Sequence, residues 1–384
     1  MKYRSETGVN LKMEKIVIAM AGFGGIGRIH QLAWSDISYI YPGQLPDIFI
    51  KGVCRSTVAG AEETASKAGF EKAYRDYDEL LADPEVDIVD LVTPNSLHKS
   101  QIMKALKAGK HVLCEKPLAL NAGEARELEQ AAVESDRQIG MVFNYRFIPA
   151  IMKAKELMEQ GRIGEIYSFR GEYFHTGYQN PSRPFSWRMD FEKSGGGALA
   201  DLGSHVIDLL RFLLGDFSSV KADMKTYIKE RPLADGSGKR ESVTVDDAAW
   251  LQCELDSGAQ GTIEVSRFAT GTLDNLNITV YGSRGSFSFK LMDPNFLYYF
   301  DEDNKGMGWN RLETLQHYPD AKIPAPRSVI GWTRFHTENQ YRFLKSIVEG
   351  KSFSPSLSDG AAVQYVMDAA YRSAAEGQRF SVSS

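Results

Sequence analysis

A glycine-rich turn near the start of the chain, together with the alternation that follows it, constrains the fold most. Residues 15–21, KIVIAMA, form an apolar run typical of a buried parallel strand. GFGGIG follows directly and places Gly22, Gly24 and Gly27 in the spacing G-x-G-x-x-G. Such a turn brings the backbone close to a diphosphate at the N-terminus of the next helix, although glycines at a strand-to-helix turn also serve packing alone.

The next 120 or so residues repeat this strand-helix unit. Further strands are predicted at 48–54, 86–94, 110–117 and 138–145, and helices at 57–69, 97–109 and 121–136. Repeated units of this kind favour dinucleotide binding over packing as the role of the turn. We therefore predict an α/β fold with an N-terminal Rossmann domain, a doubly wound parallel sheet, over residues 1–145, of which 1–13 form a flexible tail.

The end of the second predicted strand bears on the choice of cofactor. An acidic residue about 20 positions after the glycines would hold the adenosine ribose hydroxyls, but Asp47 precedes this strand and so lies at its wrong end. Arg55, Ser56 and Thr57 follow the strand and would suit a ribose 2′-phosphate. Alternatively, Arg55 stacks on the adenine of NAD. Both NAD and NADP stay open, with a tilt toward NADP.

The stretch HVLCEKPLAL, residues 111–120, places two charges and a proline directly after a strand. Ligands of open parallel sheets bind beyond the carboxyl ends of the strands, which makes Lys116 a candidate. Pro117 keeps Lys116 out of the helical conformation, and the bond between them is either cis or trans. A partly desolvated ammonium there donates to a substrate oxygen, whereas the alternative is a solvated lysine paired with Glu115.

From residue 146 onward the alternation stops. Long strand-like runs predict a mostly antiparallel, open-faced sheet in a C-terminal α/β domain over residues 146–384. The exception is a glycine-led helix at 194–217, where Asp201 and His205 lie one turn apart on one face. A neutral histidine accepts a proton, and the carboxylate orients it or binds a hydroxyl, with Asp208 as support. The alternative is a helix cap and a core histidine.

Polar and aromatic residues of this part suit a pocket for a polyhydroxylated substrate, unless the aromatic ones belong to the core. The candidate substrate residues are Arg146, Tyr173, Trp187, Arg188, Asp201 and His205. No metal site is predicted, because two ligands are too few and no cysteine or histidine cluster accompanies them.

Composition excludes several classes of protein. The net charge of -5 argues against a nucleic-acid partner. The three cysteines, Cys54, Cys114 and Cys253, are far apart, which suits a reducing compartment. No apolar run is long enough to span a bilayer, and the N-terminus has no signal-peptide pattern. We expect a cytoplasmic protein without membrane contact.

Four longer motifs make the chain resemble the Gfo/Idh/MocA family, named for glucose-fructose oxidoreductase, inositol dehydrogenase and rhizopine catabolism. They are GFGGIGRIH, TPNSLHKSQIMKALKAGKHVLCEKPLAL, FNYRFIPAIMKAKELMEQGRIGEI and GGGALADLGSHVIDL. The resemblance spans nearly the whole chain and implies that Lys116, Asp201 and His205 are catalytic. The candidate cofactor-binding residues are Gly22, Phe23, Gly24, Gly25, Ile26, Gly27, Arg55, Ser56, Thr93, Asn95, His98, Glu115 and Lys116.

The resemblance also implies a reaction: an NAD(P)-dependent dehydrogenase that transfers a hydride between nicotinamide C4 and a hydroxyl-bearing carbon of a sugar, cyclitol or sugar derivative. The open-faced sheet is expected to join subunits into a dimer or tetramer. Two alternatives stay open, because fold does not name the reaction. One is a redox-assisted glycoside hydrolase that recycles its NAD, and the other is an NAD(P)-binding sensor without catalysis.

Overall fold

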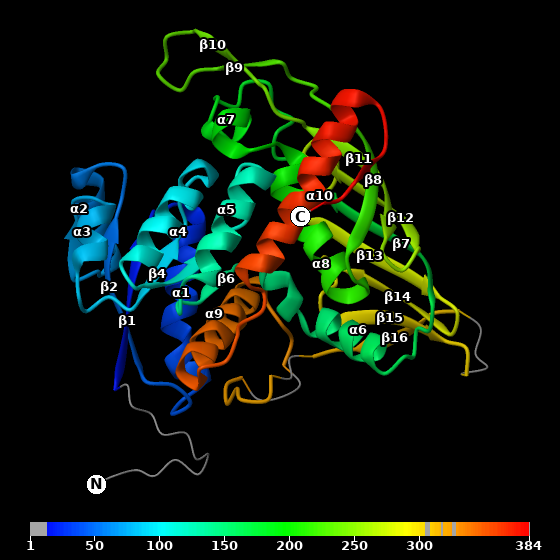
Figure 1. Cartoon of the computed structure of the whole chain (residues 1–384), viewed down its shortest axis with the longest axis horizontal. Helices are drawn as coiled ribbons and strands as arrows, with labels where there is room; N and C mark the ends of the chain where they lie inside the picture. Colours follow the sequence, from blue (N-terminus) through cyan, green and yellow to red (C-terminus); the bar gives the residue numbers. More distant parts are fainter. Residues whose placement is uncertain (1–13, 304–307, 316–317, 325–327, 384) are drawn as a thin grey trace.

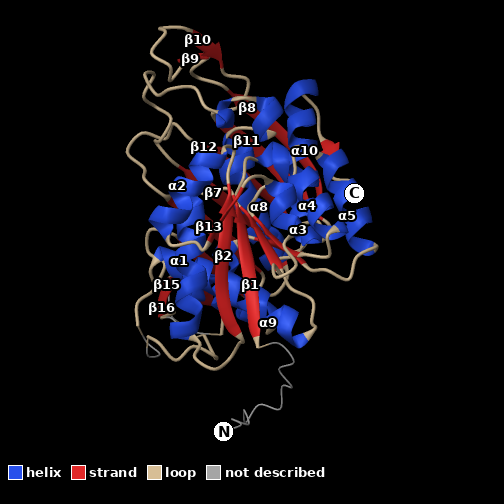
Figure 2. Cartoon of the chain, turned by 90° about the vertical axis from the view of Figure 1, so that its left-hand side faces the viewer, coloured by secondary structure: helices blue, strands red, loops and turns tan. Residues whose placement is uncertain are grey.

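The computed structural model describes residues 14–303, 308–315, 318–324 and 328–383, so the predicted tail at 1–13 lies outside the described residues (Figure 1). The N-terminal strands are β1 (Lys15–Ala21), β2 (Asp47–Cys54), β3 (Lys72–Tyr74), β4 (Ile88–Leu91), β5 (His111–Cys114) and β6 (Ile139–Met141). They form a parallel sheet in the order β3-β2-β1-β4-β5-β6, with β1 and β2 side by side in Figure 2. This doubly wound sheet confirms the predicted Rossmann architecture.

Helices connect these strands. They are α1 (Gly25–Ile40), α2 (Val58–Ala68), α3 (Tyr77–Ala82), the 3-10 turn η1 (Asn95–Leu97), α4 (His98–Lys107) and α5 (Ala122–Val133). Short polar side chains begin three of them: Thr57 accepts a hydrogen bond from the Gly60 amide at α2, Asp76 from the Glu79 amide at α3, and Asn121 from the Glu124 amide at α5. The sequence did not predict β3 and α3, because elements this short carry little periodicity.

A second sheet follows in the C-terminal half. Its strands are β7 (Ile166–Phe174), β8 (Phe217–Lys225), β11 (Ala248–Leu255), β12 (Gln260–Ser266), β13 (Asn275–Gly282), β14 (Gly285–Lys290), β15 (Phe296–Asp301), β16 (Asn310–Glu313) and β17 (Phe380–Ser381). Among the described residues the order is β16-β15-β14-β13-β7-β12-β11-β8-β17, antiparallel except between β7 and β12. The small hairpin β9 (Glu230–Pro232) and β10 (Arg240–Ser242) projects at the top of Figures 1 and 2.

The remaining helices cover one face of this sheet or return to the first. They are η2 (Asn144–Phe147), α6 (Pro149–Glu159), η3 (Trp187–Met189), α7 (Phe191–Ser194), the π-helical turn η4 (Leu199–Gly203), α8 (Ser204–Leu214), α9 (Trp332–Glu349) and α10 (Leu357–Glu376). The predicted helix at 194–217 is shorter in the structure, where η4 and α8 together span 199–214, and α7 ends at Ser194. Helix α8 packs tightly on β7, where a Cβ at Gly171 would lie 2.3 Å from a Val206 methyl carbon.

The last two long helices join the two halves of the molecule. Helix α9 packs against α1, beside which it lies in Figure 1, and α10 packs against both α5 and β8. Polar contacts of α9 reach α1 and β6: Gln340 Nε2 donates to the His30 carbonyl oxygen at 3.4 Å, and Asn339 Nδ2 to that of Met141 at 3.2 Å. Residues from the end of the chain therefore complete the surroundings of the first sheet.

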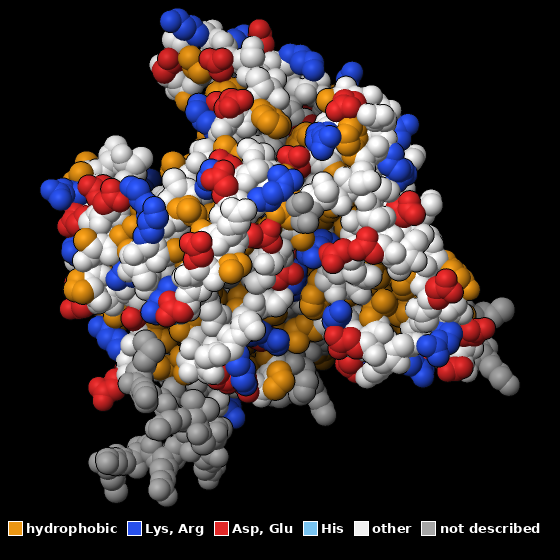
Figure 3. Space-filling view, viewed as in Figure 1, with side chains coloured by type: hydrophobic (Ala, Val, Ile, Leu, Met, Phe, Trp, Pro, Cys, Tyr) orange, Lys and Arg blue, Asp and Glu red, His pale blue; other side chains and the backbone are white. Residues whose placement is uncertain are grey.

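The surface carries both signs of charge. Figure 3 shows acidic and basic side chains interspersed over the visible face, as expected for a net charge of -5. None of the described helices is both long and apolar enough to cross a membrane.

Candidate active site

A pocket of about 830 Å³ opens where the carboxyl ends of the first sheet meet η4, α8 and β7 of the second half. Most of the predicted site residues line it: Gly22, Phe23, Gly24, Gly25, Ile26, Arg55, Ser56, Thr93, Asn95, Glu115, Lys116, Tyr173, Trp187, Arg188, Asp201 and His205. One pocket thus brings the glycine turn, the lysine of the EKP stretch and the helical Asp-His pair together.

The glycine turn has the shape that a diphosphate requires. Gly22 has φ +89°, and a Cβ there would lie 2.7 Å from the Val92 carbonyl oxygen, so a larger residue does not fit. No side chain caps α1 at Gly24, which leaves the first amides of the helix available to a ligand. Because nothing in the described chain lies within 4 Å of a Cβ built at Gly24 or Gly25, there is room for the phosphates of NAD(P).

Two residues predicted to bind the cofactor do not line the pocket, which corrects that expectation. A Cβ at Gly27 would lie 3.3 Å from a Val92 methyl carbon, so this glycine serves helix-strand packing. His98 is fully buried, with its ring nitrogens 2.9 Å and 3.1 Å from the carbonyl oxygens of Pro117 and Thr93. Through these two hydrogen bonds, His98 holds the backbone that carries the side chains of Thr93 and Lys116.

At the far end of the pocket, the cation after β2 already has partners. Arg55 Nη1 donates to Thr64 Oγ1 at 2.9 Å, which holds the guanidinium against α2. Thr57 caps the same helix, where its hydroxyl oxygen accepts the Gly60 amide. Arg75, which the sequence did not single out, also lines this end and adds a second positive charge.

The EKP lysine binds the second half of the molecule directly. Lys116 Nζ donates to the carbonyl oxygen of Asp201 at 2.7 Å and to its Oδ1 at 3.0 Å. The Lys116–Pro117 peptide bond is cis, which sequence alone left open. The two residues are 85 positions apart in the chain, so the pair joins both halves across the pocket.

A second cation shares Asp201. Arg267, at the end of β12, donates from Nη2 to Asp201 Oδ2 at 3.0 Å. Burial alone would raise the pKa of Asp201, but Lys116 and Arg267 outweigh it and hold the pKa well below its ordinary range. Asp201 is therefore a carboxylate at neutral pH, and it does not cap the helix, since Asp246 accepts the amides of Gly197 and Leu199.

His205 lines the pocket one turn beyond Asp201, with its ring tilted against Tyr145 at a centroid distance of 4.6 Å. Its Nδ1 is buried and has no hydrogen-bond partner among the described residues. Burial, and next the charge of Lys116, lower its pKa to about 3. The imidazole is consequently neutral near pH 7 and able to accept a proton.

Arg146 lies outside the pocket, which corrects its prediction as a substrate residue. Its Nε lies 2.9 Å from Asp208 Oδ2, and its Nη2 lies 2.6 Å from Asp208 Oδ1 and 3.0 Å from Asp359 Oδ1. Arg146 and Asp208 are both at least 97% buried. Asp208 therefore supports α8 through this ion pair and does not touch Asp201.

Tyr145, an aromatic residue of the NYRF stretch, also lines the pocket, and its hydroxyl lies 3.0 Å from that of Tyr173. Tyr173 donates in turn to Asp274 Oδ1 at 2.7 Å. The sequence reasoning missed several other lining residues, among them His175, Arg267, Trp332 and His336, for which spacing in the sequence gives no signal.

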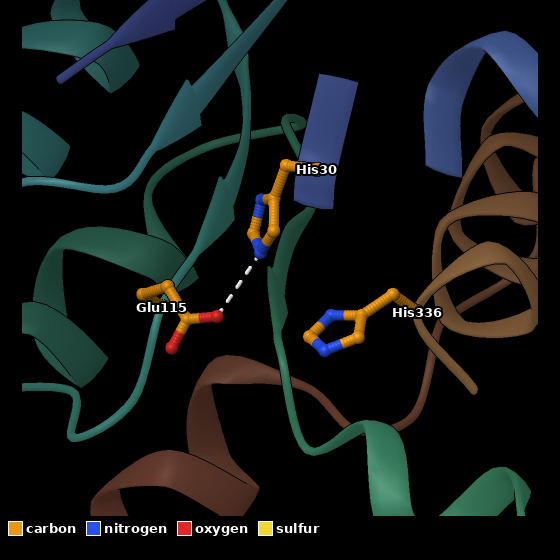
Figure 4. Close-up of side chains that lie close together, drawn as sticks. All are labelled: His30, Glu115 and His336. Carbon is orange, nitrogen blue, oxygen red and sulfur yellow. Dashed lines mark hydrogen bonds and ion pairs between the residues drawn. The ribbon is translucent and has the colours of Figure 1, made fainter. Parts of the chain in front are cut away.

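His30, Glu115 and His336 form a buried group at the wall of the pocket, brought together from α1, the end of β5 and α9 (Figure 4). His30 Nε2 lies 3.0 Å from Glu115 Oε1, and on its other side His30 Nδ1 lies 2.9 Å from Asp90 Oδ1. Both ring nitrogens of His336 are buried without a partner among the described residues.

Comparison with known families covers most of the chain. Residues 16–143 match the family described as "Oxidoreductase family, NAD-binding Rossmann fold". Residues 151–288 match the "GFO/IDH/MocA C-terminal domain". The two matches divide the chain between its two sheets.

Named relatives resemble the chain over nearly its full length. A levoglucosan dehydrogenase from Pseudarthrobacter phenanthrenivorans is 33% identical over 95% of this chain and 97% of its own. An inositol 2-dehydrogenase from Rhizobium meliloti is 28% identical over 95% and 98%. The solved structure of a levoglucosan dehydrogenase in complex with NADH and levoglucosan has a TM-score of 0.91 at 33% identity, over 96% of this chain and 100% of the other.

Proposed function

The chain belongs to the GFO/IDH/MocA family of oxidoreductases, and from this premise we propose that it is a dehydrogenase of a sugar or cyclitol with NAD as its cofactor. The reaction interconverts a secondary alcohol and a carbonyl. The observation that carries the proposal is the meeting of Lys116, Asp201 and His205 in the pocket that begins at the glycine turn.

Lys116 is held so that one donor remains for the substrate. An ammonium group has three N–H bonds, and two are directed at the carbonyl oxygen and Oδ1 of Asp201. The third can donate to the oxygen of the reacting carbon. This donor stabilises negative charge on that oxygen as the proton leaves, and it is positioned before the substrate binds.

His205 accepts the hydroxyl proton in the direction of oxidation. Since Nδ1 is buried, we assign this role to Nε2, which returns the proton when the carbonyl is reduced. Asp201 holds Lys116 in place. Its negative charge also offsets part of the positive charge of Lys116 and Arg267, because its carboxylate forms an ion pair with each of them. When bound, the nicotinamide takes up or supplies the hydride.

NAD is the cofactor that the comparisons name, whereas the sequence tilted toward NADP. Arg55 donates to Thr64 and so lies along α2 at the adenosine end of the pocket. We expect Arg55 to contact the adenosine without requiring a 2′-phosphate.

The substrate proposal rests on the relatives and on the polar lining of the pocket. Relatives are named for levoglucosan and inositol, which are compact polyhydroxylated rings. Asp201, Arg188, His175 and Tyr173 offer hydrogen-bond donors and acceptors for such hydroxyls. We therefore place anhydrosugars, monosaccharides and inositols first among the substrates to be tested.

The uncovered face of the second sheet is the proposed subunit contact. Trp250 and Tyr281 stand on this face and are 39% and 46% exposed. Burial of such aromatic side chains between two copies would stabilise a dimer or tetramer. Sedimentation of the wild type beside Trp250→Arg tests this, and a monomeric wild type would contradict it.

The direct test is a screen of purified protein with NAD and with NADP against anhydrosugars, monosaccharides and inositols, followed by the absorbance of reduced nicotinamide. We expect turnover with NAD, and a loss of kcat of about 10³-fold in Lys116→Ala with little change in NAD affinity. Lys104→Ala, which removes an exposed lysine paired with Asp78, is the matched control.

Three outcomes would contradict the proposal. Equal loss of NAD binding and of turnover in Lys116→Ala would remove the chemical role of the lysine. Release of sugar from glycosides without net reduction of the cofactor would indicate hydrolysis with recycled NAD. Tight NAD binding without turnover of any compound in the panel would indicate a sensor.

A further inference from the structure

A buried histidine connects the cofactor turn to the EKP lysine. His30 lies on α1, the helix that begins at the glycine turn, and is fully buried. Its Nδ1 meets the Asp90 carboxylate on β4 at 2.9 Å and 3.0 Å, and its Nε2 meets Glu115 at 3.0 Å. Trp34 Nε1 donates to Asp90 at 2.7 Å and completes the cluster.

The positive charge of His30 offsets part of the negative charge of this cluster. Burial would lower the pKa of His30, but Asp90 and Glu115 outweigh it and raise the pKa to about 10. Burial would likewise raise the pKa of Glu115, yet the hydrogen bond from His30 helps to lower it to about 2. An imidazolium between two carboxylates is thus the stable state, because either carboxylate alone would be a costly buried charge.

Glu115 connects His30 to the backbone of Lys116, its neighbour in the chain. Its Oε1 accepts a hydrogen bond from His30 Nε2, while its Oε2 accepts one from the backbone N–H of Lys116 at 3.1 Å. The orientation of one carboxylate therefore determines both contacts. A carboxylate free to rotate would release the backbone from which the Lys116 ammonium reaches Asp201.

We propose that His30 is a positioning residue for the reaction, whose imidazolium locks Glu115 and thereby holds the Lys116 ammonium on the substrate oxygen. This inference rests on the proposed function of Lys116. The inference also connects the proposed cofactor-binding turn to the residues that transfer the proton, since the helix that carries His30 starts at the glycine turn.

A metal ion is a poorer occupant of the same group. The ligand atoms of His30, Glu115 and His336 lie within 4.8 Å of one another (Figure 4). Both nitrogens of His30, however, already face carboxylates as donors, so that no lone pair is free for a metal. Burial, and next the charge of His30, lower the pKa of His336 to about 3, so His336 adds no second positive charge.

The titratable groups around Glu115 come from several elements. They are His30 on α1, Asp90 on β4, His98 on α4, Cys114 and Lys116 beside it in the chain, His205 on α8 and His336 on α9. Among the described residues, His30 is the one whose ring contacts both Glu115 and Asp90, one carboxylate at each nitrogen. Its removal leaves Asp90 and Glu115 without the positive charge that lies between them.

The test is His30→Gln in the full-length protein, with kcat and KM measured against pH. We expect kcat to fall by on the order of 10- to 100-fold near pH 7, with the KM for NAD changed less than about threefold. Without the imidazolium, the carboxylate pair takes up a proton at neutral pH, so activity should recover partly as the pH rises. A general loss of structure would instead lower kcat equally at all pH values.

Two further variants isolate the charge. His30→Gln/Asp90→Asn removes one of the two carboxylates and should flatten the new pH dependence. His111→Gln is the matched control, because His111 stands at the opposite end of β5 and is partly buried. It should leave the pH profile unchanged.

Two measurements do not depend on turnover. In ¹⁵N-histidine NMR spectra of the wild type and Asp90→Asn, the His30 ring of the wild type should stay protonated to about pH 9. In a crystal structure of His30→Gln, the bonds from Lys116 to Asp201 should be lengthened or lost. If the wild type turns over none of the compounds, the proposed function fails, and this crystal structure still decides the positioning role.

The inference is overturned by a wild-type kcat and pH profile in His30→Gln, by a His30 ring that loses its proton below about pH 7, or by an unchanged Lys116–Asp201 contact in the variant. Stoichiometric zinc bound by the wild type and lost in His30→Gln would also overturn it in favour of a metal site. If His30→Gln does not fold, a His30 ring that stays protonated in the NMR spectra and loss of the Lys116–Asp201 contact in Glu115→Gln would support it.

Discussion

Asp201 and Asp208 stand seven residues apart, on η4 and on the α8 that continues it, and each is paired with an arginine. Asp201 binds Lys116 and Arg267 at the wall of the pocket. Asp208 binds Arg146 in the interior, where water does not reach. Similar pairs thus serve reactivity at one end of the segment and stability at the other. The two arginines are equally buried, and the difference lies in the aspartates, whose side chains are 36% exposed at Asp201 and 2% at Asp208.

The interior ion pair of Arg146 and Asp208 can be tested by removing its arginine. Arg146→Ala leaves Asp208 and Asp359 without their main partner, and we expect the free energy of unfolding to fall by about 4 kcal/mol. The kcat of the folded fraction should change less than about threefold. Chemical denaturation and active-site titration measure the two quantities. A large fall in kcat with unchanged stability would instead indicate that Arg146 contacts the substrate.

The pocket pair should respond chiefly in its kinetics. Asp201→Asn keeps the shape but removes the charge that holds Lys116, so the kcat of the folded fraction should fall about 10²-fold. Asp208→Asn is the matched variant on the same segment, with little expected change in kcat. Similar kinetics of the two variants would erase the distinction between the two ends.

The second cation of the pocket gives a smaller effect. Arg267→Lys keeps the charge but loses the planar group that both binds Asp201 and lies over the Tyr178 ring at 4.4 Å. We expect kcat/KM to fall about tenfold, chiefly through KM for the sugar. Arg170→Lys, at an exposed arginine of β7, is the control. A change confined to NAD affinity would argue against a place at the substrate end.

The smallest effect concerns His205, which lies between the two aspartates. Because its pKa is held near 3, the imidazole stays neutral as the pH falls from 8 to about 5. The profile of kcat/KM should therefore show no acid limb near pH 6.5, and the rate should change less than about twofold from this cause. An acid limb near 6.5 that disappears in His205→Gln would show an ordinary histidine.

Local patterns in the sequence predicted the elements that position the site. The glycine turn, the strand-helix alternation and the spacing of Asp201 and His205 are each encoded within a few neighbouring residues. Lys116 could be chosen because carboxyl ends of parallel strands meet at one edge. These signals depend on the local conformation of the chain, which short stretches largely determine.

The partners of these residues could not be predicted in the same way. Arg146 and Asp208 are 62 positions apart, and His30 and Glu115 are 85 apart. The sequence pattern of an arginine beside aromatic residues is the same for a pocket lining and for an interior ion pair. Arg146 was therefore assigned to the substrate, and Arg267 was overlooked. Only tertiary packing decides which charged groups lose their water, and that packing has no local period.

The packing of α9 on α1 bears on how such proteins can be recombined. A chimera cut after residue 145 would import Trp34 and Tyr41 without their covering helix, and the aromatic stack of Tyr41 on Tyr341 would lose one ring. Exchange of nucleotide-binding modules between relatives must therefore transplant residues 332–349 as well, although they are encoded nearly 200 codons downstream.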